Sequence, residues 1–235
     1  MNITDLQLAR TGQHPCSYLA EQQESLIFTL PEQPLTAQLY QQLMQLNFRR
    51  TGEQLYRPYC RNCQACQAVK IDPSQFSPSR SQRKLWRKAL KLDWHYRINR
   101  QPDCEAYYEL YLHYIREKHA DGSMYPPSPD QLDAMFACDW LPIVTLEQYL
   151  DGRLVGVLLL DEVLQSWSAV YSFYDPTVPL ALGRVAILAA LAAAKAQQQQ
   201  YLYLGYYISD CQKMAYKADF LPQQRLIQHN WQSFD

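Results

Sequence analysis

Residues 142–174 read PIVTLEQYLDGRLVGVLLLDEVLQSWSAVYSFY, and this stretch decides the fold. It contains three runs rich in β-branched, aromatic and aliphatic residues, at 142–150, 153–160 and 166–174. The first two runs are separated by Asp151-Gly152, a pair that is typical of tight β-hairpin turns. The stretch therefore predicts three consecutive antiparallel strands.

Helical patterns flank these strands. Residues 103–119 place Tyr107, Tyr111 and Ile115 at helical spacing, and residues 180–200 are rich in alanine, a strong helix former. A short tyrosine-rich strand is expected at 201–208. The chain thus belongs to the α+β class, with a C-terminal unit at 103–235 and a separate N-terminal region at 1–102.

The N-terminal region carries an unusual charge. Between Arg49 and Arg100 there are 13 Lys and Arg residues against three carboxylates, although the whole chain has a net charge of −1. Residues 79–88 predict a basic helix, since their cations recur at three- and four-residue steps. A solvated helix face is the plain interpretation. We favour a polyanion, with nucleic acid first, because neighbouring like charges repel one another.

The same region holds four cysteines that could bind a metal. Cys60, Cys63 and Cys66 recur at three-residue intervals, and Cys16 would supply a fourth thiolate for tetrahedral zinc or an iron–sulfur cluster. The alternative is a set of packing or surface thiols. Seven cysteines and no apolar run in the first 17 residues argue against a secreted disulfide protein, so we expect a cytoplasmic chain without membrane association.

Several motifs together resemble one known family. They are Cys16-Ser-Tyr-Leu, the run from Tyr56 to Cys66, Ser79-Arg-Ser-Gln-Arg, residues 171–176 (YSFYDP), Leu182-Gly183, residues 203–208 (YLGYYI) and residues 211–217 (CQKMAYK). In this order they resemble the aminoacyl-tRNA protein transferases, and most of all their compact bacterial leucine-transferring branch. That resemblance implies a GNAT-like acyltransferase fold, with a mixed central sheet flanked by helices. Arginyl members of the family space their cysteines differently: they carry a Cys-x-x-Cys near the N-terminus and two adjacent cysteines later in the chain.

The resemblance implies the reaction. An enzyme of this kind transfers leucine from leucyl-tRNA to the amino group of a protein that begins with Asp or Glu, which creates an N-terminal degradation signal. Its partners would be the aminoacyl-tRNA donor and the acidic acceptor. The ester is already activated, so no cofactor is required for the chemistry, and holding both substrates together supplies most of the rate.

The candidate site residues follow from their chemical role and from their position beside these motifs. Asp175, just after the third strand, is the candidate proton acceptor, and the tyrosines would orient amine and ester. The acceptor's carboxylate needs a cation, for which Arg80, Arg83 and Arg184 are available. Lys213 and Lys217 would instead contact the terminal phosphates of the tRNA acceptor end. The assigned catalytic set is Asp175, Tyr174 and Tyr206, and the binding set is Arg80, Arg83, Lys84, Tyr171, Gly183, Arg184, Tyr207, Lys213 and Lys217.

Three alternatives stay open at this level. An arginyl donor differs from a leucyl donor by a pocket whose lining the sequence does not locate. An acyl-CoA transferase of the same fold is disfavoured, because residues 179–185 contain one glycine and lack the expected pyrophosphate loop. A non-catalytic, zinc-stabilised tRNA-binding protein would explain the basic segment but leaves the motifs of residues 171–217 without a purpose.

Overall fold

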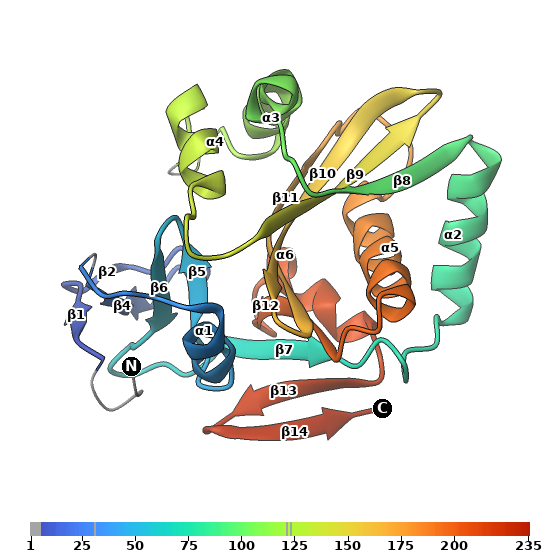
Figure 1. Ribbon diagram of the computed structural model, residues 1–235. Helices are drawn as coiled ribbons and strands as arrows, with labels where there is room; N and C mark the ends of the chain where they lie inside the picture. Colours follow the sequence, from blue (N-terminus) through green and yellow to red (C-terminus); the bar gives the residue numbers. More distant parts are fainter. Residues whose placement is uncertain (1–5, 31, 121, 123) are drawn as a thin grey trace.

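The computed structural model describes residues 6–30, 32–120, 122 and 124–235, and is built around one large mixed sheet (Figure 1). The strand order in this sheet is β14-β13-β7-β12-β11-β10-β9-β8. The strands are β7 (Gln67–Ile71), β8 (Trp94–Asn99), β9 (Ile143–Leu150), β10 (Arg153–Val163), β11 (Ser166–Tyr174), β12 (Tyr201–Tyr207), β13 (Gln223–Ile227) and β14 (Asn230–Phe234). Helices pack against this mixed sheet, so the predicted α+β class, with a mixed central sheet flanked by helices, is confirmed.

The predicted three-strand meander is present. β9, β10 and β11 pair antiparallel, and Asp151 and Gly152 between β9 and β10 both have positive φ, at 49° and 73°. Two positive φ values are what a primed hairpin turn requires. β10 continues three residues past the predicted end at Leu160, because Asp161, Glu162 and Val163 still pair with β11.

β11 and β12 separate along their length. They pair in parallel only at Ser166–Ser168 with Tyr201–Tyr203, although β11 runs on to Tyr174 and β12 to Tyr207. β12 pairs with β7 on its other side. The carbonyl groups of β11 beyond Ser168 therefore face a gap in the sheet, which other groups must fill.

Helices cover the two faces of the sheet. α2 (Arg80–Lys91) and α5 (Leu182–Ala196) pack together on one face, where α5 contacts the strands from β9 to β12. On the other face lie α1 (Ala37–Met44), α3 (Cys104–Lys118) and α4 (Pro129–Phe136) (Figure 1). Tyr107, Tyr111 and Ile115 of α3 are buried against Val157 and Phe173 of the meander, as their spacing predicts. The helix α2 begins with a reciprocal cap between Ser79 and Gln82.

A smaller antiparallel sheet lies beside the large one. Its order is β1-β4-β6-β5, with β1 (Leu8–Arg10), β4 (Leu26–Thr29), β6 (Gln54–Pro58) and β5 (Arg49–Thr51), and a short ladder joins β2 (His14–Pro15) to β3 (Gln23–Glu24). Arg50 of β5 ties it to the large sheet, because its Nε lies 2.7 Å from Oδ1 of Asp161 and both side chains are fully buried.

The N-terminal 102 residues contribute to both sheets. β7 and β8 belong to the large sheet, whereas β1, β4, β5 and β6 form the small one. The division at residue 102 stays a prediction, and residues 1–5 of that region lie outside the described ones. Within the described chain, none of the helices has the length and hydrophobicity that crossing a membrane requires.

Candidate functional site

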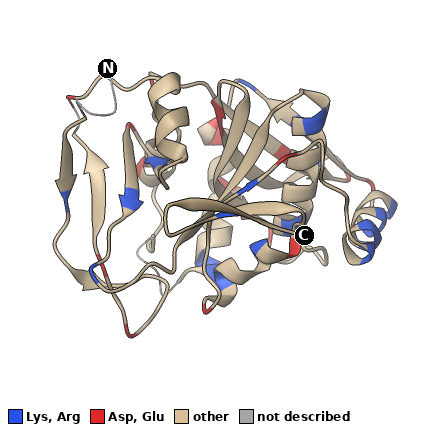
Figure 2. Cartoon of the chain, turned by 90° about the horizontal axis from the view of Figure 1, so that it is seen from below, with Lys and Arg blue, Asp and Glu red and all other residues tan. Residues whose placement is uncertain are grey.

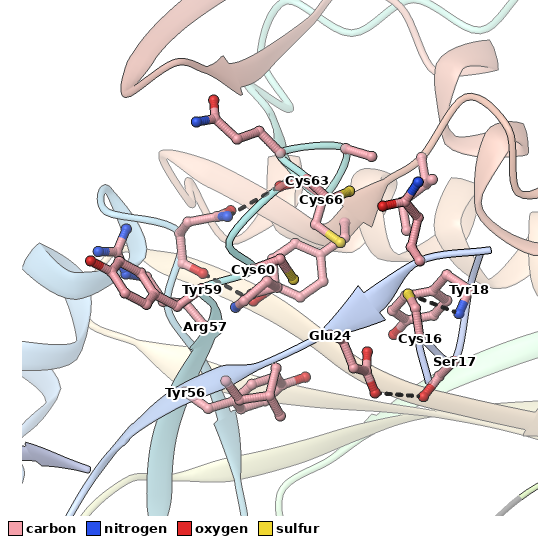
Figure 3. Close-up of a pocket in the computed structure, with 18 of the residues that line it drawn as sticks. Cys16, Ser17, Tyr18, Glu24, Tyr56, Arg57, Tyr59, Cys60, Cys63 and Cys66 are labelled. Carbon is pink, nitrogen blue, oxygen red and sulfur yellow. Dashed lines mark hydrogen bonds between the residues drawn. The ribbon is translucent and has the colours of Figure 1, made fainter. Parts of the chain in front are cut away.

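A cavity of about 540 Å³ opens between the small sheet and the end of β12 (Figure 3). Three segments form most of its wall: residues 16–28, residues 54–66 and the C-terminal part of β12 with the turn between β13 and β14. Tyr18, Tyr56 and Tyr206 line it, together with one carboxylate, Glu24. Oε1 of Glu24 accepts a hydrogen bond of 2.8 Å from Ser17 Oγ, so this carboxylate is already engaged.

The four candidate cysteine ligands line this cavity. Cys60, Cys63 and Cys66 come from the loop between β6 and β7, and Cys16 follows β2 on the facing segment (Figure 3). Burial, with the other cysteines next in effect, raises the pKa of Cys66 to about 12. Within the described chain no three metal-ligating side chains converge on one point, and a metal would need these thiols deprotonated. The zinc or iron–sulfur centre stays a prediction, and no chemical step is assigned to it.

Arg49 of β5 fills the gap between β11 and β12. Its Nη2 donates to the carbonyl of Ala169 at 2.5 Å and to that of Val170 at 3.3 Å, and its guanidinium lies 5.4 Å from the Tyr206 ring centroid. Gly205 makes room for it, since a Cβ at this position would lie 2.1 Å from Arg49 Nη1. Neither residue was singled out from the sequence. A glycine inside a strand was the available signal, because it often marks a close approach.

The two lysines assigned to the tRNA end are placed differently from each other. Lys213 is exposed on α6 (Gln212–Ala215), whereas Lys217 lies in the following 3₁₀ turn, η2 (Tyr216–Asp219), and is 5% exposed. Lys217 Nζ donates to the carbonyl of Tyr206 at 2.5 Å and lies 3.1 Å from the Met214 sulfur. Because α6 ends at Ala215 and the 3₁₀ turn η2 follows, the two lysines do not share one helix face.

The four assigned tyrosines surround the gap from different sides. Tyr206 is buried and its hydroxyl donates to the carbonyl of Asn47 at 3.0 Å, while the Tyr207 ring lies under the Arg225 guanidinium. Tyr171 and Tyr174 belong to β11, where the Tyr171 hydroxyl contacts the Met124 sulfur. The structure brings Tyr206 to the cavity and leaves the other three outside its lining.

Gly183 and Arg184 begin α5. A Cβ at Gly183 would lie 3.4 Å from the ring of Tyr174, an ordinary van der Waals distance, so the first turn of α5 packs against this tyrosine of β11. Arg184 Nη1 lies 2.8 Å from Asp219 Oδ2, and both side chains are about half exposed. The guanidinium of Arg184 is therefore already paired.

Asp175 closes the turn after β11. Its Oδ2 accepts 2.8 Å from Arg153 Nη1, and its Oδ1 accepts from the backbone and hydroxyl of Thr177 at 2.9 and 2.6 Å. Burial raises the pKa of Asp175, but the hydrogen bonds from Thr177 and Arg153 outweigh it and bring the pKa down to about 2. A carboxylate with so low a pKa is a weak proton acceptor at neutral pH.

We expect Asp175→Asn to destabilise the protein by about 2 kcal/mol at pH 7, because the depressed pKa corresponds to that much stabilisation of the ionised carboxylate. The stabilisation is complete above the unfolded-state pKa near 4 and is lost as the pH falls through about 2. Urea unfolding of both proteins between pH 7 and 2 measures it, with Asp151→Asn in the exposed hairpin turn as control. Unchanged stability with a lost single-turnover rate would instead assign Asp175 to proton removal.

The basic helix α2 lies apart from this cavity. It carries six cations and no carboxylate, at positions Arg80, Arg83, Lys84, Arg87, Lys88 and Lys91. In the described chain none of the six forms an ion pair, and all are exposed. Figure 2 shows this helix at the right with its Lys and Arg positions in blue. Lys88 Nζ donates to the carbonyl of Pro179 at 2.6 Å, which ties α2 to the segment before α5.

The remaining cations of residues 49–100 include several with partners elsewhere. Arg50 pairs with Asp161, Arg97 with Glu147 and Arg100 with Glu162. Carboxylates from other parts of the fold thus neutralise some of the positive charge of residues 49–100. Most of the cations in this segment that lack an ion pair lie on α2.

Comparison with known proteins gives a consistent result for both halves. Two family models match: "Arginine-tRNA-protein transferase, N terminus" at residues 14–84 and "Arginine-tRNA-protein transferase, C terminus" at residues 106–227. Among curated proteins, the aspartate/glutamate leucyltransferase of Aeromonas hydrophila is 42% identical over 98% of this chain and 96% of its own. The Pseudomonas aeruginosa protein of the same name is 42% identical over 97% of each chain.

Solved structures are more distant. FemX has a TM-score of 0.44 at 10% identity, covering 88% of this chain and 81% of its own. L-PGS from Bacillus licheniformis has a TM-score of 0.48 at 11% identity, covering 61% of this chain and 47% of its own.

Proposed function

We propose that this chain, which belongs to the arginine-tRNA-protein transferase family, transfers leucine from leucyl-tRNA to the N-terminal amino group of proteins that begin with Asp or Glu. The observation that carries the proposal is the 42% identity to aspartate/glutamate leucyltransferases over nearly the whole chain, with family models matching both halves. The chain is accordingly an aminoacyl-tRNA protein transferase. The product carries an N-terminal leucine, which would mark it for degradation by an N-end rule route in the cytoplasm.

The distribution of charge supports a tRNA donor. The six unpaired cations of α2 form an exposed row, and Lys88 joins that row to the segment before α5. That segment follows Tyr174, at the end of β11 where the sheet has opened. A tRNA acceptor arm lying on α2 would therefore bring its 3′ end toward the gap between β11 and β12.

The transfer reaction needs little acid–base catalysis from the protein. An aminoacyl ester is activated toward amines, and a protein α-amino group has a pKa near 8, so a useful fraction is unprotonated at neutral pH. The enzyme gains most of its rate by holding amine and ester in contact and excluding water. We keep Asp175, Tyr174 and Tyr206 as candidate catalytic residues, with Asp175 the weakest candidate for the reason given above.

A CoA donor is further disfavoured by the gap itself. In a GNAT-like sheet, an extended acyl carrier would hydrogen-bond to strand carbonyls where β11 and β12 separate. Here the guanidinium of Arg49 already donates hydrogen bonds to two of those carbonyls, at Ala169 and Val170. Gly183 lies inside α5 against Tyr174 rather than in a glycine-rich loop.

Donor and acceptor choice can be tested in one matrix. Purified protein is incubated with labelled leucyl-tRNA or arginyl-tRNA and with peptides that begin with Asp, Glu, Lys, Arg or Ala, without acetyl-CoA. We expect leucine on the Asp and Glu peptides only. Arginine on those peptides would keep the family and change the donor, and no transfer from either donor would favour a non-catalytic tRNA-binding protein.

We expect exchange of Arg83 and Lys84 for Ala to weaken tRNA binding and to reduce the slope of log K against log salt by about 2, one for each lost phosphate contact. Filter binding of leucyl-tRNA between 50 and 200 mM salt, roughly the range over which such contacts are felt, measures the slope. Arg116→Ala with Lys118→Ala, two exposed cations in the last turn of α3, is the matched control. An unchanged slope removes this part of α2 from the interface.

A further inference from the structure

Glu24 is the one acidic residue among the described residues that line the cavity, and only one of its oxygens is engaged. Oε1 accepts the hydrogen bond from Ser17 and lies 3.4 Å from Nδ1 of His14. Oε2 accepts no hydrogen bond from the described residues, and it points away from Ser17 (Figure 3). Because the side chain is 13% exposed, water solvates this oxygen poorly. A shielded carboxylate oxygen at a cavity wall is suited to bind a cationic group of a ligand.

Apolar side chains continue the wall from Glu24. Side chains of an extended segment alternate between its two faces, and the residues between Glu24, Leu26 and Phe28 are buried on the opposite face. Glu24, Leu26 and Phe28 all line the cavity. On the neighbouring strand β6, Pro58 pairs with Leu26 and Tyr56 pairs with Phe28, and both also line it. The carboxylate and an apolar surface therefore lie side by side on one wall.

The cavity lies at the end of β12 that has separated from β11. Tyr206 and Ile208 line it, and both come after Tyr203, the last residue of β12 that pairs with β11. Leu226 of β13 also lines it, and both Ile208 and Leu226 are buried apolar side chains. A tRNA 3′ end at the separated ends of β11 and β12, as proposed above, would thus lie at the same end of β12 as the cavity.

We propose that this cavity holds the leucyl group of the donor, with its α-ammonium on Oε2 of Glu24 and its side chain against Leu26 and Phe28. The assignment rests on the proposed function and deepens it, because it states where the donor's amino acid binds. In leucyl-tRNA the α-ammonium is free and the α-carboxyl group is an uncharged ester, so one carboxylate matches the charge of the leucyl group. A cavity of about 540 Å³ has room for this group and its ribose.

The acceptor's α-ammonium is a poorer occupant. The acceptor's first residue, Asp or Glu, would bring a second carboxylate close to Glu24, and like charges repel. Among the described lining residues, the guanidinium of Arg57 lies over the rings of Phe48 and Tyr59, and His229 belongs to the exposed turn between β13 and β14. Neither cation is placed on the wall beside Glu24 to offset that repulsion.

The same lining favours a leucyl donor over an arginyl donor. A guanidinium that leaves water needs a carboxylate partner. Once an α-ammonium occupies Glu24, the other described residues of the lining offer no acidic side chain. A leucine side chain needs only apolar surface, which Leu26, Phe28 and Leu226 supply. The cavity therefore accounts for a choice of donor that the sequence leaves open.

Hydrolysis-resistant mimics of the donor end test the assignment without tRNA or acceptor. Adenosine would carry leucine, arginine or isocaproic acid through a 3′-amide, the last being leucine without its α-ammonium. Calorimetry would measure the three mimics on the wild type, on Glu24→Gln, which can still accept from Ser17, and on Glu21→Gln, an exposed control outside the lining. The wild type and the control should bind the leucyl mimic at least about tenfold more tightly than the other two.

Glu24→Gln should lose the preference for the leucyl over the isocaproyl mimic and keep its affinity for the isocaproyl mimic. A merely structural role of Glu24 would weaken both mimics equally, and that result overturns the pocket. If Glu24→Gln does not fold, the wild-type ratio of leucyl to isocaproyl affinity carries the test, and a ratio near one overturns it.

Further outcomes separate the pocket from the proposed function. No binding of the leucyl mimic to the wild type overturns the pocket. Weaker binding of the peptide Asp-Ala-Ala to Glu24→Gln, with unchanged binding of the leucyl mimic, also overturns it, in favour of the acceptor's α-ammonium. If the mimics bind as expected but the wild type transfers no leucine to peptides that begin with Asp or Glu, the proposed function fails while the leucyl pocket stands.

Discussion

Gly205→Ala is expected to lower leucine transfer by at least about 100-fold, because the added Cβ would lie 2.1 Å from Arg49 Nη1 and 2.5 Å from its Cζ. The guanidinium cannot yield without giving up its hydrogen bonds to Ala169 and Val170. Those two carbonyls would then lie unpaired in the gap between β11 and β12.

The strain of the backbone must be separated from this clash. Gly205 has a φ of +74°, where alanine costs about 1 kcal/mol by itself. Gly152 in the hairpin turn has a φ of +73° and open space where a Cβ would be, so Gly152→Ala carries the same strain without the clash. Transfer rates and unfolding curves of the two variants should differ by the effect of Arg49 alone. Equal behaviour of the two would show that displacing the guanidinium has no consequence for activity.

Arg50→Met is expected to destabilise the protein by about 3–5 kcal/mol, the range for removing one partner of a fully buried ion pair. Arg50 and Asp161 are both fully buried, and Arg50 also donates to the carbonyls of Gly52 and Met135. Among the described residues, the hydroxyl of Tyr40 would then be the remaining side-chain hydrogen-bond partner of the buried Asp161. Since this pair joins the small sheet to β10, its loss should loosen the small sheet, which lines one side of the cavity.

A partly exposed pair provides the comparison. Arg100 bonds Glu162 with both guanidinium nitrogens, but its side chain is 53% exposed, so Arg100→Met should cost no more than about 1 kcal/mol. Denaturant unfolding of each variant measures the difference. Arg50→Met with Asp161→Leu should recover part of the loss, because no uncompensated charge is then buried. A small cost for Arg50→Met, equal to that of Arg100→Met, would contradict the role of burial in this account.

The local patterns predicted the meander and its neighbouring helices well. Alternating β-branched and aliphatic residues, the turn at Asp151 and Gly152 and the alanine-rich run each act over a short range, so they are legible in the chain itself. The small sheet was not predicted, because its strands are three to five residues long and all but β4 contain charges or a proline. Such short strands form because of the neighbouring strands they pair with, and that pairing is not visible in the local sequence.

The candidate site was predicted less completely for a related reason. The motifs located Tyr206, Lys217 and the four cysteines, which the fold brings to one region, but not the direction in which each side chain points. Lys213 and Lys217 are four residues apart, yet a 3₁₀ turn buries one and leaves the other in solvent. Arg49 lies far from Gly205 in sequence. The two meet because β11 and β12 separate and the Arg49 side chain fills the gap beside Gly205, which the sequence does not reveal.

One measurement tests the central claim most directly: the mass of a Glu-initiated peptide and of its Gln-initiated counterpart after incubation with leucyl-tRNA and the purified wild-type protein. We predict addition of a single leucine to the amino terminus of the Glu peptide and no addition to the Gln peptide. An unmodified Glu peptide, or equal modification of both, would contradict the proposed transfer to acidic N-termini.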